Sequence, residues 1–486
     1  MSSLPESTPA GFARHRLIGL FAGPLFALSL ALSPTPEGLS QEGWWTAAVG
    51  LLMAIWWMTE ALPLAVTALA PLILFPLLEV RSIDDTAASY AHPLVFLFLG
   101  GFLLARAMQV WGLDRRIALG VVRLAGTDPR RLIAGIMGVT AFLSMWVSNT
   151  ATSMVMLPIA LSILSRLSAQ DQEGGAGFAP ALLLGVAYAA TIGGMGTLVG
   201  TPPNALFAAY MAESQGIDIG FAQWMTVGVP VAFVMLLAAW FVLTHLAFRV
   251  DGKLPPATSS AEPVATERIT IPERSVAAIL ALVALFWIFS PLLKSALPRL
   301  HLSDAGIAIT GAFLLFLIPA DLRRGRFLLH WSDAAGIRWD VLILFGGGLA
   351  LAAAIAGTDL TPWLARQLTG LGAWPTFALL LTIGIFVVFL GELASNTAMA
   401  AVFLPLAGAS ALAVGEPVVL LALPVALFAT LGFMLPVATP PNAVIFGSGA
   451  IKMGDMLRAG IVLDIVGIAV VAAGIYFFGD ALFGNR

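Results

Sequence analysis

The sequence predicts an all-α integral membrane protein built from two inverted repeats. Three observations predict this fold class. Hydrophobic residues make up 59% of the 486 residues and charged residues only 10%, and the mean hydropathy is +0.95, which is typical of a chain solvated by lipid. Apolar stretches long enough to cross a bilayer recur along the chain, and a set of short motifs occurs twice. We predict about eleven transmembrane helices plus two re-entrant helical hairpins.

The charge balance and the absence of cysteine exclude several classes of function. The formal net charge is −3, with 24 Lys and Arg residues against 27 Asp and Glu residues. Without a long basic run, the sequence gives no electrostatic footprint for a nucleic acid. The chain has no Cys, which excludes disulfides, thiolate metal sites and cysteine nucleophiles. We therefore expect its partners to be the lipid bilayer and a small solute.

Apolar stretches of about 20 residues are long enough to cross a bilayer. Residues 1–16 are predicted to be an N-terminal tail, and the apolar run Leu17–Leu32 is interpreted as a retained first span rather than a signal peptide, because many further spans follow it. The predicted spans lie near residues 17–33, 44–59, 61–80, 93–111, 180–213, 224–248, 275–296, 303–320, 340–357, 417–450 and 457–480.

Two other apolar stretches, residues 132–165 and 375–414, are predicted to be re-entrant hairpins. The first has no charged residue or His over 34 residues, and as one helix it would be about 51 Å long, which exceeds the hydrocarbon core. The polar Ser148-Asn149-Thr150 at its centre leaves two arms that are too short to span. The second stretch repeats this design around Ser395-Asn396-Thr397.

A constant shift along the chain shows that the two halves are duplicates. Ser148 and Ser395 are 247 residues apart, and so are Gly100 and Gly347. One shift therefore aligns a span, a connector and a hairpin, as expected for a transporter fold with internal repeats. We divide the chain into a first repeat at 17–250, a cytoplasmic linker at 251–274 and a second repeat at 275–486.

A Thr-Pro-Pro-Asn sequence also occurs in both halves, at 201–204 and 439–442. Two prolines inside an apolar segment cannot continue helical hydrogen bonding, so each sequence predicts a helix broken into two halves. The unwound carbonyl groups would then be available as cation ligands. A single copy is also compatible with a simple kink.

Basic residues between the predicted spans indicate the orientation. On the count of spans, all of the basic loops fall on one side, which is then cytoplasmic. This predicts a cytoplasmic N-terminus in the cell (inner) membrane, with the hairpin at 132–165 entering from the cytoplasm and the one at 375–414 from outside. The residues used are Arg130, Arg131, Arg166, Arg323, Arg324, Arg326, Lys452 and Arg458.

Polar residues at the two hairpin tips point to a binding site. An open helical ladder at bilayer depth costs several kcal/mol unless protein, substrate or ions satisfy the freed groups. Helix N-termini favour an anion, while hydroxyl and amide groups bind carboxylate oxygens. A lone Ser-Asn-Thr is more often a cap or a helix contact, but two copies in matched hairpins favour a site for a small dianion.

At these residues the sequence resembles the divalent-anion/sodium symporter family, which includes the sodium-coupled di- and tricarboxylate transporters. The resemblance rests on both tips, both Thr-Pro-Pro-Asn sequences and the stretch Thr59–Thr67. It implies a homodimer with scaffold and transport domains and elevator-type alternating access. The predicted substrate-binding residues are Ser148, Asn149, Thr150, Ser395, Asn396, Thr397, Thr201, Thr439 and Pro440.

The resemblance also implies two sites for Na⁺ as coupling ion. The first would use Ser144, Ser148, Asn149 and the carbonyl of Gly200, and the second Ala394, Asn396 and Ala438. The sequence departs from the family at Gly391, which the internal shift aligns with Ser144, and where related symporters carry a hydroxyl residue. We therefore predict a weakened second cation site.

The resulting hypothesis is a Na⁺-coupled secondary transporter of C4-dicarboxylates such as succinate, malate and fumarate, and not an enzyme. Neither tip contains Arg or Lys, so bound cations would supply part of the electrostatic attraction. The alternatives are a dicarboxylate exchanger, a sulfate transporter, a passive channel and, remotely, a membrane-embedded hydrolase with Ser148 or Ser395 as nucleophile. Glu60 and Glu392 are expected to be buried carboxylates, which either have a structural role or attract a coupling cation or relay protons.

Overall fold

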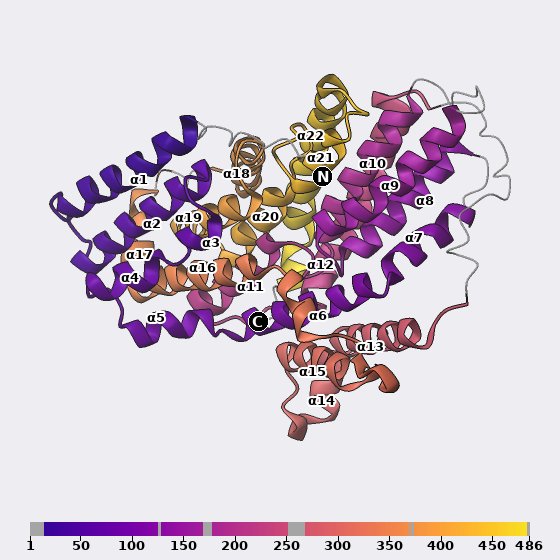
Figure 1. Ribbon diagram of the computed structural model, residues 1–486. Helices are drawn as coiled ribbons and strands as arrows, with labels where there is room; N and C mark the ends of the chain where they lie inside the picture. Colours follow the sequence, from indigo (N-terminus) through magenta and orange to yellow (C-terminus); the bar gives the residue numbers. More distant parts are fainter. Residues whose placement is uncertain are drawn as a thin grey trace, which may run out of the picture.

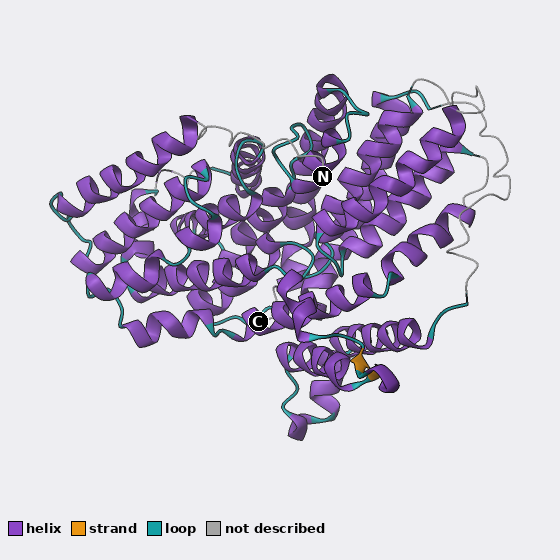
Figure 2. Ribbon diagram, in the orientation of Figure 1, coloured by secondary structure: helices purple, strands orange, loops and turns teal. Residues whose placement is uncertain are grey.

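The computed structural model describes residues 14–124, 128–168, 177–250, 268–368, 370 and 374–483. The predicted linker at 251–274 and the predicted tail at 1–16 lie mostly outside these residues. Helices make up most of the described chain, which confirms the all-α prediction (Figure 2). The described strands are one short antiparallel pair, β1 (Pro319–Asp321) and β2 (Arg326–Phe327).

The first half of the chain contains twelve α-helices in the described residues, and the last continues into a π-helical turn, Val242–Ala247. The helices are α1 (Arg14–Leu32), α2 (Gln41–Thr59), α3 (Leu64–Thr67), α4 (Ala70–Leu77), α5 (Ile83–Tyr90), α6 (Pro93–Val110), α7 (Leu113–Leu124), α8 (Pro129–Ser144), α9 (Asn149–Ser168), α10 (Phe178–Gly194), α11 (Pro202–Gln215) and α12 (Phe221–Phe241).

The second half contains ten described α-helices and a short 3₁₀ segment, η5 (Trp331–Gly336), before α16. The helices are α13 (Ile271–Ile288), α14 (Ser290–Ala296), α15 (Asp304–Leu317), α16 (Trp339–Gly357), α17 (Leu360–Gln367), α18 (Thr376–Gly391), α19 (Asn396–Val414), α20 (Val418–Thr430), α21 (Pro440–Gly447) and α22 (Met453–Phe483).

Some of the predicted element bounds are wrong. The first helix begins at Arg14, inside the predicted tail. The predicted span 61–80 is split into α3 and α4, where Pro63 and Pro71 begin new helical turns instead of continuing one helix. The predicted span 275–296 is likewise split into α13 and α14. Proline at the start of a helix therefore shortened several apolar segments.

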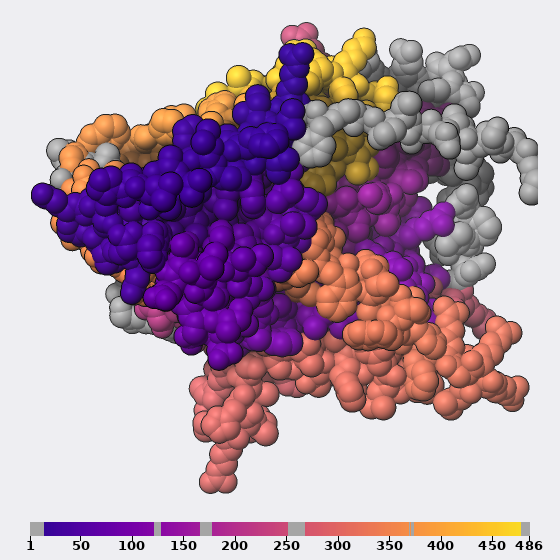
Figure 3. All heavy atoms as spheres, turned by 60° about the vertical axis from the view of Figure 1, so that its left-hand side comes forward, coloured from indigo at the N-terminus to yellow at the C-terminus, as the bar shows by residue number. Residues whose placement is uncertain are grey.

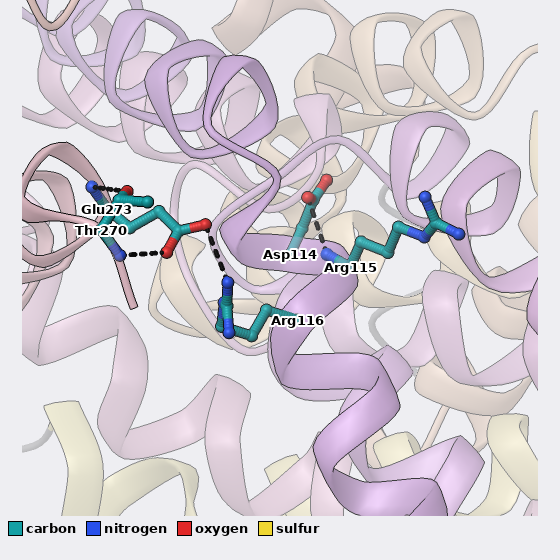
Figure 4. Close-up of polar contacts among 5 residues, drawn as sticks. All are labelled: Asp114, Arg115, Arg116, Thr270 and Glu273. Carbon is teal, nitrogen blue, oxygen red and sulfur yellow. Dashed lines mark hydrogen bonds and ion pairs between the residues drawn. The ribbon is translucent and has the colours of Figure 1, made fainter. Parts of the chain in front are cut away.

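Helix α13 begins at Ile271, four residues before the predicted span 275–296, because a capping box at Thr270 starts it there. The Thr270 hydroxyl accepts a hydrogen bond from the Glu273 N–H at 3.3 Å, and Glu273 accepts one from the Thr270 N–H at 2.9 Å. The same carboxylate pairs with Arg116 on α7 at 3.1 Å (Figure 4). This ion pair fastens the first helix of the second half to the first half.

Within the described residues, seven helices are long and apolar enough to cross a membrane, and six shorter apolar segments accompany them. Helix α1 is the most exposed of the seven, with 11% of its apolar window buried, and its apolar side chains face outward, for example Phe21 (68% exposed) and Leu25 (66%). Figure 3 shows the N-terminal helices in indigo over one broad face. An apolar surface of this kind needs lipid or another apolar partner.

The two halves interlock at their broken helices. Helices α10 and α20 are buried along almost their whole length. Helix α10 packs against α21, and α11 against α20, so each broken helix contacts the one from the other half. Helix α9 of the first hairpin contacts α21, and α19 of the second contacts α11. The two hairpins therefore flank a shared centre (Figure 1).

Candidate functional site

The first hairpin turns at residues 145–148, between α8 and α9. Three oxygen atoms surround the end of the Asn149 side-chain amide: Ser144 Oγ at 2.6 Å, Ala190 O at 3.2 Å and Gly200 O at 3.2 Å. With its nitrogen toward them, the amide donates to all three. With its oxygen toward them, it completes a cluster of four oxygen atoms, which is an arrangement suited to a cation.

Three of the four residues predicted for the first cation site come together around this amide. Ser144, Asn149 and the carbonyl of Gly200 converge, and the carbonyl of Ala190 joins them although the sequence did not indicate it. The Ser148 hydroxyl instead accepts a hydrogen bond from the Ala151 N–H at 3.3 Å, as a cap of α9. Uncharged hydroxyl, amide and carbonyl oxygens are ligands that a hard cation accepts.

A glycine allows Asn149 to approach α10. A Cβ atom at Gly194 would lie 2.6 Å from Asn149 Oδ1, which is closer than real Cβ atoms come to a neighbour. The Thr197 hydroxyl donates to the Met145 carbonyl at 2.5 Å, which fastens the tip to the loop after α10. The first tip is therefore held against the break of its own repeat.

The break itself lies earlier than predicted. Helix α10 ends at Gly194 and α11 begins at Pro202, so residues 195–201 form the interruption, and the prolines start the second half-helix. Proline is well suited to that position, because the first N–H groups of a helix have no partner in any case. The Asn204 amide donates to Gly194 O at 3.0 Å and to Thr197 O at 2.7 Å, across the break.

The second break repeats this geometry. Helix α20 ends at Thr430 and α21 begins at Pro440. The Asn442 amide donates to Gly432 O and to Leu435 O, both at 3.0 Å. These carbonyl groups are 238 residues beyond their counterparts in the first half. The final Asn of each Thr-Pro-Pro-Asn sequence thus holds the two ends of its break together.

The second tip differs from the first in one respect. Asn396 occupies the position of Asn149, but its buried Oδ1 has no hydrogen-bond partner in the described residues. The counterpart of Ser144 is Gly391, where an added Cβ would meet Met399 Cγ at 3.7 Å, an ordinary contact, as its nearest neighbour. The second tip therefore lacks the hydroxyl that contacts the amide in the first, and has room for one.

Glu392, next to Gly391, connects the second hairpin to the second break. Its side-chain oxygens accept hydrogen bonds from the N–H groups of Met434 at 2.9 Å and Leu435 at 2.8 Å, and it is 1% exposed. Asp464 on α22 is also fully buried, and neither of its carboxyl oxygens has a hydrogen-bond partner among the described residues. The expectation of a buried carboxylate is thus met at Glu392.

Glu60 is different, and the prediction that it is buried is wrong. Its side chain is 47% exposed and pairs with Arg16 at 2.8 Å. The residue lies at the end of α2 with a φ of 47°. A carboxylate that reaches solvent and an arginine needs no internal cation to balance its charge.

The remaining predicted residues are buried to different degrees. Thr201, Thr439, Thr397, Ala394 and Ala438 are buried, with exposures between 2% and 9%. Ser148, Thr150 and Ser395 are half-buried, and Pro440 is exposed.

Sequence reasoning missed Arg106 on α6, which lines a pocket together with Ser148. No motif could have paired these two residues, because they lie on separate helices.

A tyrosine links the two repeats at the centre. The Tyr188 hydroxyl, on α10, donates to the Phe433 carbonyl in the loop of the second break at 2.8 Å. Both side chains are fully buried, and their rings meet edge to face with centroids 5.1 Å apart. The helix that precedes the first break therefore contacts the second break directly.

The chain is similar to known membrane transporters in sequence and in fold. A family model described as "Sodium:sulfate symporter transmembrane region" matches residues 14–484. The sodium-dependent dicarboxylate transporter SdcS of Staphylococcus saprophyticus is 39% identical over 479 residues, which cover 96% of this chain and 92% of that protein. SdcS of Staphylococcus aureus strain USA300 is 39% identical over 483 residues, with 97% and 93% covered.

Two solved structures share the fold at low sequence identity. The YdaH transporter of Alcanivorax borkumensis superposes with a TM-score of 0.59 at 12% identity, over 96% of this chain and 97% of that one. MtrF of Neisseria gonorrhoeae superposes with a TM-score of 0.56 at 13% identity, over 95% and 93%. At such identities the likeness concerns the fold alone.

Proposed function

Because this chain belongs to the sodium:sulfate symporter family, we propose that it is a secondary active transporter of C4-dicarboxylates such as succinate, malate and fumarate, coupled to Na⁺. The oxygen cluster around Asn149 is the observation that carries the proposal. The name of the SdcS relatives supports both the dicarboxylate and the sodium dependence.

The first cation site would be formed by Ser144, Asn149, Gly200 and, in addition, Ala190. These ligands carry no net charge, so a bound Na⁺ would leave the tip positive and attract a carboxylate. The chain itself positions the oxygens: α8 supplies the hydroxyl, the break supplies a carbonyl, and Gly194 leaves space for the amide. Ser148 is a weaker candidate ligand, because its hydroxyl caps α9.

The second cation site would use Ala394, Asn396 and Ala438 and is proposed to bind more weakly. Its amide has no hydroxyl partner, because Gly391 replaces the counterpart of Ser144. The substrate would bind to Ser148, Asn149 and Thr150 at one tip and to Ser395, Asn396 and Thr397 at the other, with Thr201, Thr439 and Pro440 from the breaks. Elevator motion, a homodimer and a cytoplasmic N-terminus in the cell membrane belong to the same proposal.

Replacing Gly391 with serine is expected to strengthen the second site. The added hydroxyl would match Ser144 and fits without a clash, since its Cβ meets an ordinary contact at 3.7 Å. The half-saturating Na⁺ concentration for succinate uptake should fall roughly threefold to tenfold, which corresponds to one hydrogen bond or ligand of about 1 kcal/mol. A sodium titration of uptake checks this, and an unchanged half-saturating concentration and Hill slope would contradict it.

Gly474→Ser on α22 is a matched control for that titration. A Cβ at Gly474 meets nothing within 4 Å, so the same substitution is sterically tolerated there. Its sodium titration should coincide with that of the wild type.

Uptake of labelled succinate into proteoliposomes tests the function. We expect inward Na⁺ to drive accumulation into empty vesicles, with unlabelled malate and fumarate competing. Accumulation that requires internal succinate and ignores Na⁺ would indicate an exchanger, which the unpartnered Asn396 of the second tip would favour. Competition by sulfate but not by malate would indicate an oxyanion carrier. The absence of both driven uptake and exchange would contradict the proposal.

A further inference from the structure

A pocket of about 40 Å³ opens beside the first hairpin tip. Ser148 and Val147 line it on the hairpin side, and Arg106 and Gln109 of α6 line it on the other. Residues of the segment from Gly336 to Arg338 complete it. A volume of this size holds a few water molecules or one carboxylate group, but not a whole dicarboxylate.

The two arginines that line this pocket differ in their partners. Arg338 holds the carboxylate of Asp340 in a bidentate ion pair, with contacts of 2.8, 2.9 and 3.2 Å. Arg106 is half-buried and donates to two neutral acceptors, the Asp333 carbonyl at 3.3 Å and Gln109 Oε1 at 3.4 Å. Within the described part of the chain, no carboxylate oxygen lies within 4.0 Å of its guanidinium nitrogens. A half-buried cation without a counter-charge attracts an anion.

Gly336 lies against the guanidinium of Arg106 beside the pocket. A Cβ at this position would lie 3.2 Å from both Cζ and Nε of Arg106, a tight contact that the arginine would have to relieve by shifting a few tenths of an ångström. The bond from Nε to the Asp333 carbonyl fixes its orientation. The two hydrogen bonds are long, and they leave most of the five donors of the guanidinium for another acceptor.

We propose that Arg106 and Ser148 form an accessory carboxylate subsite, where one carboxylate group of the transported dianion lodges as it enters or leaves the first tip. The inference rests on the proposed function and names a cation that neither tip contains. The subsite supplies the permanent positive charge that the neutral hydroxyl and amide groups of the tip lack. The guanidinium of Arg106 makes only two long hydrogen bonds to neutral protein acceptors. It can therefore bind the carboxylate for a time and return to these acceptors when the anion leaves.

Two substitutions test the positive charge of this subsite: one removes it, and the other neutralises it. Arg106→Gln deletes the cation but keeps an amide that can still donate to the Asp333 carbonyl. Gln109→Glu is nearly isosteric and places a carboxylate where Oε1 now lies, 3.4 Å from Arg106, so the guanidinium acquires a counter-charge without being removed. Both should raise the KM for succinate about tenfold, as expected for a lost bond to a charged group, with the maximal rate changed less than about twofold. Arg106→Lys should lie between these variants and the wild type.

Arg324→Gln is the matched control, because its guanidinium is exposed, is not among the residues that line the pocket and is paired with Asp321. Its KM should stay within about twofold of the wild type. The inference is overturned if Gln109→Glu leaves the KM unchanged, or if Arg106→Gln and Arg324→Gln raise it equally. Absent uptake by the wild type in the same proteoliposomes would refute the proposed function itself, before any variant is compared.

Discussion

Replacing Asn149 with alanine is expected to reduce Na⁺-driven succinate uptake by at least about 100-fold. The amide contacts Ser144, Ala190 and Gly200 together. Its removal leaves two carbonyl groups and a hydroxyl without their central partner and takes away a ligand of the proposed cation site. Loss of a preorganised polar group of this kind typically costs about 2.7–4 kcal/mol. Initial rates of uptake at saturating Na⁺ measure the effect.

Ser165→Ala on the same helix is the control for this variant. The Ser165 hydroxyl is exposed and donates to the Ser162 carbonyl within α9, far along the helix from the tip. Its uptake should equal that of the wild type. An Asn149→Ala protein that elutes as a folded species and still transports at the wild-type rate would refute the role of the first tip.

The second large effect concerns the stability of the protein. Glu392→Ala should lower the midpoint of thermal unfolding in detergent by several degrees and strongly reduce uptake. The substitution leaves the N–H groups of Met434 and Leu435 buried without acceptors, at about 1–3 kcal/mol for each group. Glu392→Gln keeps one acceptor oxygen and should lie between alanine and the wild type.

Glu60→Ala provides the contrast, because this carboxylate is 47% exposed and only pairs with Arg16. Exposed ion pairs contribute little to stability, so its unfolding midpoint should match that of the wild type within error. Equal destabilisation by Glu60→Ala and Glu392→Ala would show that the two bonds to the second break are not what stabilises this region.

The repeat could be predicted well from the sequence, because a duplicated chain repeats its physical constraints. When the first half of the sequence is shifted by 247 residues, α8 aligns with α18, and the start of α9 aligns with the start of α19. The first hairpin extends three residues beyond the predicted range 132–165 at each end, since α8 starts at Pro129 and α9 ends at Ser168. The Asp128 side chain caps α8 by accepting from the N–H groups of Arg130 and Arg131, so the helix includes charged residues that the prediction assigned to a loop.

The contacts between separate segments could not be predicted. The convergence of Ser144 and Asn149 follows from a turn of known spacing, but the carbonyls of Ala190 and Gly200 come from a helix and a break further along the chain. Arg106 lies 42 residues before Ser148, and only the packing of α6 against the η5 segment places it beside the tip. Periodicity and composition report local constraints, whereas these contacts depend on how the two halves interlock.

The bond between Tyr188 and Phe433 has a mechanical consequence. It joins the helix before the first break to the loop of the second, and both residues are fully buried. A hinge that opened between the two breaks would strand the Phe433 carbonyl in apolar surroundings without a donor, at a cost of about 1–3 kcal/mol. A conformational change that carries a solute across the membrane therefore costs least when the two break loops move together as one rigid body.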